Sequence, residues 1–227
     1  MKFDNQRHSK GTSMSSLIFY TQPDAVVVAT DTLAVSPDGS PFCFCTKAGY
    51  IPHLRTIIAG TGAGGFSSQW LLHASTRMVV RGICNLDFHT PKGLRELWDT
   101  YKKEYSLTDD STTTVYQFGF SEESGEVVSF AYRSINNFQS EPLQFGTGVK
   151  PACTVLEGNL LDIIPDMMVE QRKNEAEKPH GEKVYIGGEI IALVLTKNGC
   201  NHLKIGEFED FSTDEKSVFE NFSRMTN

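Results

Sequence analysis

The first third of the chain contains short apolar runs rich in β-branched residues. Two such runs occupy residues 16–21 and 25–31, and Pro23-Asp24 between them has the composition of a tight turn. This pattern predicts an antiparallel hairpin. Two more short apolar runs, at residues 42–46 and 54–59, predict further strands.

The spacing of apolar residues then changes from that of strands to that of helices. After the glycines at residues 62–65, one apolar residue recurs every four positions, at Phe66, Trp70, Ala74 and Met78. A second helix is predicted to begin with Thr90 as its N-cap and Pro91 as its first helical residue.

The rest of the chain alternates between strand and helix patterns. In chain order we expect strands at 113–120 and 126–132, a strand-like segment at 142–145 with a tight turn at 145–148, a helix at 160–173, a long strand at 184–196, a last strand at 202–206 and a closing helix from Ser212 or Thr213. Asn198-Gly199 is a strong hairpin signal before the last strand. Strands and helices that come in blocks predict an α+β fold with antiparallel sheets.

Length and composition favour one domain. The 227 residues are 39% hydrophobic, which is enough to bury a substantial core. Residues 1–14 are polar and without periodicity, so we interpret them as a flexible leader or propeptide and residues 15–227 as the single folded domain.

The charge balance excludes several classes of partner. A formal net charge of −7 disfavours nucleic acid and anionic lipid. No apolar run is long enough for a bilayer, and the polar start lacks the apolar core of a secretory signal. We therefore expect a cytoplasmic protein that binds neither nucleic acid nor membrane.

The cysteines and histidines do not form a recognised metal motif. Five cysteines are an odd number at irregular spacing, which disfavours a disulfide framework. Cys43 and Cys45 would share one face of a strand, as a metal or redox pair or simply as two strand cysteines, and the second interpretation is favoured because no further pair has ligand spacing. We expect no metal and no cofactor.

Four residues of the first third have the chemistry of an amide hydrolase. A free N-terminal serine at Ser15 would carry its own base, because its α-amino group has a pKa near 8. Lys47 would lower the pKa of the nucleophile, Asp31 would hold Lys47, and the Gly60 amide would stabilise an oxyanion.

The spacing of these residues resembles that of the N-terminal-nucleophile (Ntn) hydrolases of the proteasome β-subunit and HslV-like family. Ser15, Asp31 and Lys47 align without a gap with the family's nucleophile, aspartate and lysine, and Gly60 aligns after one deletion. Thr147, in a Gly-Thr-Gly stretch, matches a family turn that supplies a hydroxyl near the nucleophile.

The resemblance implies a four-layer αββα sandwich and hydrolysis of amide bonds, in peptides or small amides, through an acyl-enzyme on Ser15. It also implies a homo-oligomer, for which a ring is one possible form. The resemblance does not identify an unfoldase partner.

The sequence departs from the family in three ways. Its nucleophile would be serine instead of threonine, and Lys183 and Ile186 occupy positions where active members carry an aspartate and a serine. Ser15 also becomes N-terminal only if the leader is removed or if synthesis starts at Met14, and we favour the second route.

Two alternatives remain. The chain could be an inactive ring or scaffold subunit of the same fold, which the two missing polar residues favour. Residues 60–65 also satisfy G-x-G-x-x-G, with Asp87 as a distal acid, so a nucleotide-binding protein is a less favoured alternative.

Overall fold

The computed structural model describes residues 15–36 and 38–225, and most of its strands form two five-stranded sheets. The first sheet contains, in spatial order, β10 (Gly146–Lys150), β1 (Leu17–Gln22), β2 (Ala25–Asp31), β11 (Glu189–Thr196) and β12 (Gly199–Glu207). The second contains β5 (Ala48–Ile51), β6 (Thr56–Gly62), β7 (Thr113–Phe120), β8 (Val127–Arg133) and β9 (Ser140–Pro142). A short hairpin of β3 (Leu33–Val35) and β4 (Pro41–Phe44) stands apart from both. All the pairings are antiparallel.

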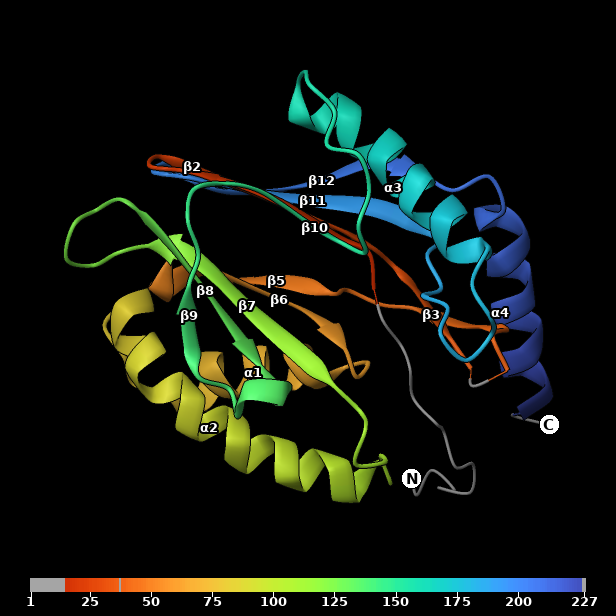
Figure 1. The fold of residues 1–227 in the computed structure, drawn as a ribbon, viewed down its shortest axis with the longest axis horizontal. Coiled ribbons are helices and arrows are strands. Elements are labelled where there is room, and N and C mark those ends of the chain that lie inside the picture. The colour runs from red at the N-terminus through yellow and green to blue at the C-terminus, as the bar shows by residue number, and fades with distance from the viewer. Residues whose placement is uncertain (1–14, 37, 226–227) are drawn as a thin grey trace.

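Four α-helices accompany the sheets in the described part of the chain. They are α1 (Phe66–Arg77), α2 (Ile83–Glu104), α3 (Leu160–Ala176) and α4 (Phe211–Met225). Figure 1 shows α1 and α2 beside the second sheet, α3 beside the first, and α4 at the end of the molecule near β3. The predicted mixed fold with antiparallel sheets is confirmed. No helix among the described residues is long and apolar enough to cross a bilayer.

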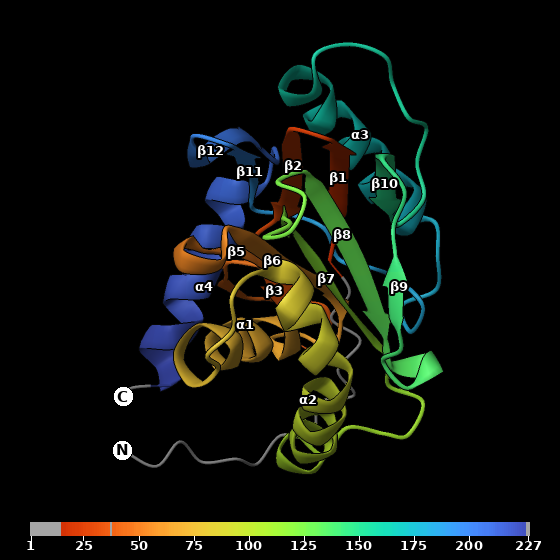
Figure 2. The ribbon, with the colours of Figure 1, turned by 90° about the vertical axis from the view of Figure 1, so that its left-hand side faces the viewer.

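Buried apolar side chains form three clusters that explain this arrangement. One cluster joins the two sheets, with Leu17 and Val28 of the first packed with Phe118 of the second. The second contains Phe66, Trp70 and Trp98 of α1 and α2 together with residues of the second sheet, such as Ile58 and Val115. The third joins α3 to the first sheet through side chains that include Ile164, Met168 and Ala192. Figure 2 shows the same order of elements from the side, with α3 above the first sheet and α1 and α2 below the second.

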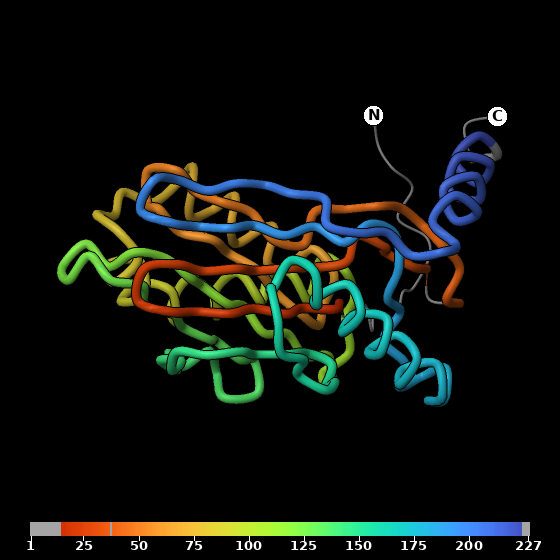
Figure 3. Tube along the Cα trace, turned by 90° about the horizontal axis from the view of Figure 1, so that it is seen from above, coloured from red at the N-terminus to blue at the C-terminus, as the bar shows by residue number. Residues whose placement is uncertain are grey.

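The hairpins of the first sheet are aligned so that their turns lie at one end. β2 pairs with β1 and with β11, and β11 turns into β12 as the sequence predicts, with Lys197 and Asn198 in the turn and Gly199 as the first residue of β12. In Figure 3 the β1–β2 and β11–β12 turns lie together at one end. Asp31, the last residue of β2, therefore lies at the other end, toward α4 and the β3–β4 hairpin.

The start of α2 differs from the prediction. The helix begins at Ile83, so Thr90 and Pro91 are inside it instead of at its N-terminus. Its first amides are satisfied from another part of the chain: the Glu122 carboxylate accepts from the nitrogens of Cys84 at 3.0 Å and Asn85 at 2.7 Å. A cap donated by a distant turn leaves no local sequence signature, which explains the error.

The tight turn predicted at residues 145–148 is also wrong, because residues 146–148 begin strand β10. Gly148 lies opposite Phe19, and a Cβ on Gly148 would come within 2.1 Å of the Phe19 ring. The glycine therefore makes room for an aromatic side chain of the neighbouring strand. The short strands β3 and β5 were not predicted, since each has only three or four residues.

Candidate active site

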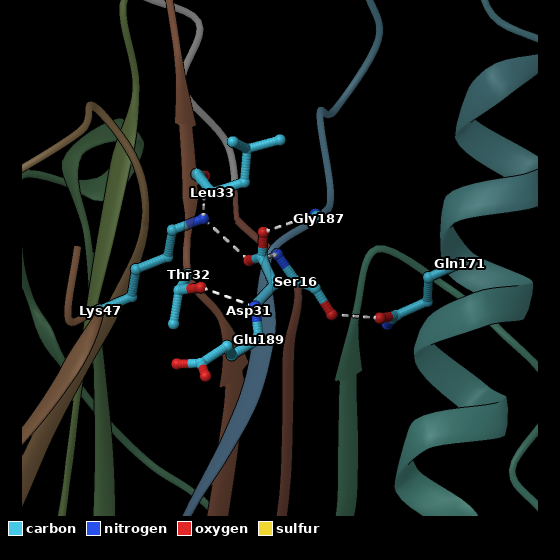
Figure 4. Close-up of polar contacts among 8 residues, drawn as sticks. All are labelled: Ser16, Asp31, Thr32, Leu33, Lys47, Gln171, Gly187 and Glu189. Carbon is cyan, nitrogen blue, oxygen red and sulfur yellow. Dashed lines mark hydrogen bonds and ion pairs between the residues drawn. The ribbon is translucent and has the colours of Figure 1, made fainter. Parts of the chain in front are cut away.

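Asp31 ends β2 with a side chain that is completely buried. Its Oδ1 accepts from Lys47 Nζ at 2.8 Å and from the Ser16 nitrogen at 3.0 Å, and its Oδ2 accepts from the Gly187 nitrogen at 3.1 Å. Figure 4 shows these donors arriving from separate segments of the chain. Two of the sequence-predicted site residues, Asp31 and Lys47, are thus in direct contact.

Lys47 lies between β4 and β5 and is also buried, with 7% of its surface exposed. Besides Asp31, its Nζ donates to the carbonyl oxygen of Leu33 at 2.6 Å. A buried ammonium group requires such partners, because transfer of an isolated charge out of water is very costly. The two contacts hold the lysine head at the end of β2.

The environment of Asp31 has opposing effects on its protonation. Burial raises the pKa of the Asp31 carboxyl, because the charged form loses water. The Lys47 ammonium opposes that rise, and so do the hydrogen bonds from the amides of Gly187 and Ser16. With three donors on its two oxygens, the group is arranged as an acceptor that positions its neighbours.

Ser15 lies two residues before the start of β1, and 8% of its surface is exposed. Its successor Ser16 is fixed twice: the Ser16 nitrogen donates to Asp31, and the Ser16 Oγ donates to Gln171 Oε1 at 2.5 Å. Asp31 Oδ1 therefore contacts both Lys47 Nζ and the peptide nitrogen that follows Ser15. Three of the expected residues, Ser15, Asp31 and Lys47, lie together at this end of the sheet.

Gln171 is a site residue that the sequence analysis missed. It belongs to α3 and is fully buried, and its Nε2 donates to the carbonyl oxygen of Pro151 as well. A signal for it was present, because Gln171 and Glu175 continue the buried stripe that Ile164 and Met168 begin. A polar residue on a buried helical stripe requires a polar partner.

Gly60 lies in the middle of β6, and its neighbour Ala59 pairs with Ala48. The same register, extended by one place, puts Gly60 beside Lys47. Ala63 donates to Thr112 across the β7 edge of β6, so alternate residues, including Gly60, direct their amides toward the β5 edge. A Cβ on Gly60 would also lie 2.4 Å from Ser67 Cβ, so close packing of α1 alone would explain a glycine here.

Thr147 does not join the other residues, which corrects the sequence prediction. It pairs with Tyr20 in β1 and is exposed. Tyr20 is five positions along the strand from Ser15, a separation of roughly 17 Å at the usual rise per residue. The error has the same origin as the predicted turn, since the glycines beside Thr147 belong to a strand.

Lys183 and Ile186 provide no polar partners for Ser15. Ile186 is buried in the apolar cluster under α3. The Lys183 Nζ lies over the Tyr185 ring at 5.3 Å, in the lining of a pocket of about 250 Å³ that also includes Leu33 and Asp210. Of the two positions at which the resemblance led us to look for an aspartate and a serine, one is therefore a buried apolar side chain and the other is a lysine in the lining of a pocket.

The glycine stretch at 60–65 does not have the surroundings of a dinucleotide site. Such a site requires a parallel βαβ unit, whereas β6 is antiparallel to both β5 and β7. The Gly64 carbonyl accepts from the Tyr101 hydroxyl, and Asp87 accepts from Tyr132 and Ser140. The strand arrangement on which the nucleotide-binding alternative rests is therefore not present around residues 60–65. Within the described residues no group of three His, Cys, Asp or Glu side chains could hold a metal ion.

Comparisons with known proteins link the chain to one fold. No family model matches the sequence, and no curated protein matches it. Among solved structures it is similar to Anbu, an ancestral beta-subunit from Yersinia bercovieri, with a TM-score of 0.57 and 9% sequence identity over 93% of this chain and 95% of that one. At this identity the likeness shows a distant, proteasome-like fold and nothing finer.

This finding corrects the family assignment made from the sequence. Membership of the proteasome β-subunit and HslV-like family is wrong. No family model covers the chain, and the similarity to Anbu rests on 9% sequence identity, which shows the fold alone. The short motifs around Asp31 and Lys47 therefore carried the fold correctly and the family incorrectly.

Proposed function

We propose that the protein hydrolyses amide bonds, in peptides or small amides, with Ser15 as an N-terminal nucleophile. The observation that carries the proposal is the buried Lys47–Asp31 ion pair, whose shared oxygen also binds the amide next to Ser15. A buried pair of this kind costs desolvation energy and is often no more stabilising than apolar residues would be. Its presence beside a serine at a strand start supports a chemical role.

The proposed reaction needs a free amine on Ser15, and hence removal of residues 1–14 or synthesis from Met14. Those 14 residues lie outside the described part of the chain. The Ser15 Oγ attacks the substrate carbonyl while its proton passes to the α-amino group, which then protonates the departing amine. Water hydrolyses the resulting ester and restores Ser15.

Lys47 and Gly60 would support this reaction electrostatically. The Lys47 charge favours the ionised hydroxyl of the nucleophile, and Asp31 with the Leu33 carbonyl holds that charge in place. The amide of Gly60, directed toward the same edge, would donate to the oxyanion. Asp31 would remain a positioning group that does not contact the substrate.

We also infer the four-layer αββα arrangement for this chain. The three apolar clusters support it, because they lie between helices and sheet, sheet and sheet, and sheet and helix in turn. A homo-oligomer is proposed as well. Its support is the set of large apolar side chains exposed on the helices, among them Leu72, Phe88 and Phe219.

The alternative is a scaffold subunit without activity, which one observation favours. Ile186 is buried among apolar side chains at the position where an active site would gain a hydroxyl. In that case the Lys47–Asp31 pair would only fix the ends of β2 and β5.

A β-lactone probe separates the two functions. The chain is produced to start at Met14, so that removal of the methionine exposes Ser15, and intact mass verifies the new terminus. The hydrolase proposal expects one added probe mass, absent in Ser15→Ala and retained in Ser68→Ala, which alters an exposed serine of α1. A correctly processed, folded chain that gains no probe mass establishes the scaffold alternative instead.

A further inference from the structure

Cys43 and Cys45 flank Phe44 at the end of β4, close to the Asp31–Lys47 pair. Cys43 pairs with Ala34 in the β3–β4 hairpin, and the Cys45 nitrogen donates to the Thr32 carbonyl oxygen at 2.8 Å. The backbone is therefore extended through both cysteines. Alternate residues of an extended chain share a face, so the two thiols lie on one side of the hairpin.

The intervening Phe44 packs on the other side. Its ring meets the Phe211 ring of α4 edge-on at 5.1 Å, which fixes the orientation of the segment. Cys45 is exposed, whereas Cys43 is half-buried. The pair therefore consists of one accessible thiol and one protected neighbour.

The surroundings favour the thiolate of Cys45. A hydrogen bond with the Cys43 thiol lowers the pKa of Cys45 to about 7, and the Lys47 charge adds to this effect, while burial and Asp31 oppose it. The same hydrogen bond and burial raise the pKa of Cys43. By contrast, burial raises the pKa of Cys153 and of Cys200 to about 11. Cys45 is thus the nucleophilic member of the pair.

We propose that Cys43 and Cys45 form a peroxide-reactive dithiol site, in which Cys45 is oxidised first and Cys43 closes an intrastrand disulfide. In the first step the Cys45 sulfur attacks a peroxide oxygen, and the O–O bond breaks to give a sulfenic acid and water. In the second step the Cys43 sulfur attacks the sulfur of Cys45 and a second water leaves. Two electrons pass from the sulfurs to the peroxide.

The extended backbone makes such a disulfide easy to reverse. Two residues of a strand span roughly 6.6–6.8 Å, which is the upper limit of the Cα separation that a disulfide tolerates. A bridge at that limit is strained, and strained, exposed disulfides are the readily reduced ones. The geometry therefore favours a reversible site over a structural cross-link. With only two sulfur ligands and no third ligand in the described residues, it does not favour a metal site.

Mass spectrometry of the full chain after hydrogen peroxide treatment tests the proposal. The expected result is loss of two hydrogen atoms from the peptide that contains both cysteines, reversed by dithiothreitol. In Cys43→Ser the sulfenic acid on Cys45 should persist and be trapped by dimedone, whereas Cys45→Ser should leave Cys43 unoxidised. Cys153→Ser and Cys200→Ser are the matched controls and should retain the reaction.

Alkylation by iodoacetamide at pH 7 gives an independent measurement. Cys45 should react at least about tenfold faster than Cys153 or Cys200, because much more of it is thiolate. Equal alkylation rates, or Cys43 and Cys45 both remaining reduced after peroxide treatment, would overturn the proposal. Neither measurement depends on hydrolase activity, so its outcome is separate from that of the proposed function.

Discussion

At the scale of single residues, Asp31 connects segments that are far apart in the sequence. Its two oxygens accept from Ser16, the residue before β1, from Lys47 and from Gly187, in the chain before β11. A carboxylate used in this way has no apolar equivalent, because its removal leaves a lysine charge and two amides without their acceptor.

We therefore predict that Asp31→Asn lowers the free energy of unfolding by about 3–5 kcal/mol, since it leaves the buried Lys47 ammonium without its counter-charge. Urea denaturation measures this loss. The control is Asp24→Asn, which changes an exposed aspartate and should remain within about 0.5 kcal/mol of the unmodified chain. Equal losses in the two variants would contradict the role assigned to the ion pair.

Gln171 is the second residue whose role can be measured. Its side-chain amide bridges the Ser16 hydroxyl and the Pro151 carbonyl. A double-mutant cycle of Ser16→Ala with Gln171→Leu should give a coupling energy of about 1 kcal/mol. The cycle of Ser68→Ala with Gln171→Leu should be additive, because Ser68 is an exposed residue of α1. Additivity in both cycles would show that the hydrogen bond between Ser16 and Gln171 makes no net contribution.

At the scale of elements, α2 depends on a cap from outside its own sequence. The hydrogen bonds from Cys84 and Asn85 reach Glu122 in the β7–β8 turn. Burial alone would raise the pKa of Glu122, but these and other backbone hydrogen bonds outweigh it and lower the pKa below its usual 4.5. The charged carboxylate therefore stabilises the helix N-terminus.

The sign of this shift gives a pH dependence. Because the pKa of Glu122 is lower in the folded protein, its contribution is complete above pH 4.5 and disappears as pH falls through the folded value. Glu122→Gln should lower the free energy of unfolding by about 0.3–1 kcal/mol at pH 7, with a smaller difference at pH 3. Urea titrations at the two pH values measure it, with Glu123→Gln as the control. A difference that does not change with pH would argue against a charged cap.

The elements that local patterns specify were predicted well. The β1–β2 hairpin, β7 and the β11–β12 hairpin follow from β-branched runs and turn residues. The start of α2 was not predicted, because the residue that caps it comes from the distant β7–β8 turn. Strand β10 was not predicted, because Gly148 is there to accommodate the Phe19 ring. Within the candidate site, the Asp31–Lys47 contact was predicted from the spacing of Ser15, Asp31 and Lys47 along the sequence. Gln171 was missed, because its partner Ser16 lies 155 positions away along the chain and its partner Pro151 lies 20 positions away.

At the scale of the whole molecule, the assembly state is the main expectation. Sedimentation should give a mass that is a multiple of the 25.2 kDa chain, because large apolar side chains are exposed on the helices. The chain starting at Met14 and the full chain should be compared at several concentrations. A single species with the monomer mass of each chain at every concentration would contradict the oligomer and leave the β-lactone experiment unaffected.

The attachment of Ser16 has a consequence for the entropy of the reaction. A chain end normally loses order over its first few residues, and a catalytic group located there would have to be immobilised in each turnover. Here the second residue of the proposed N-terminus is held through both its backbone nitrogen and its hydroxyl. The ordering of Ser15 is then largely completed during folding, so that a substrate would meet a nucleophile already close to its reactive position.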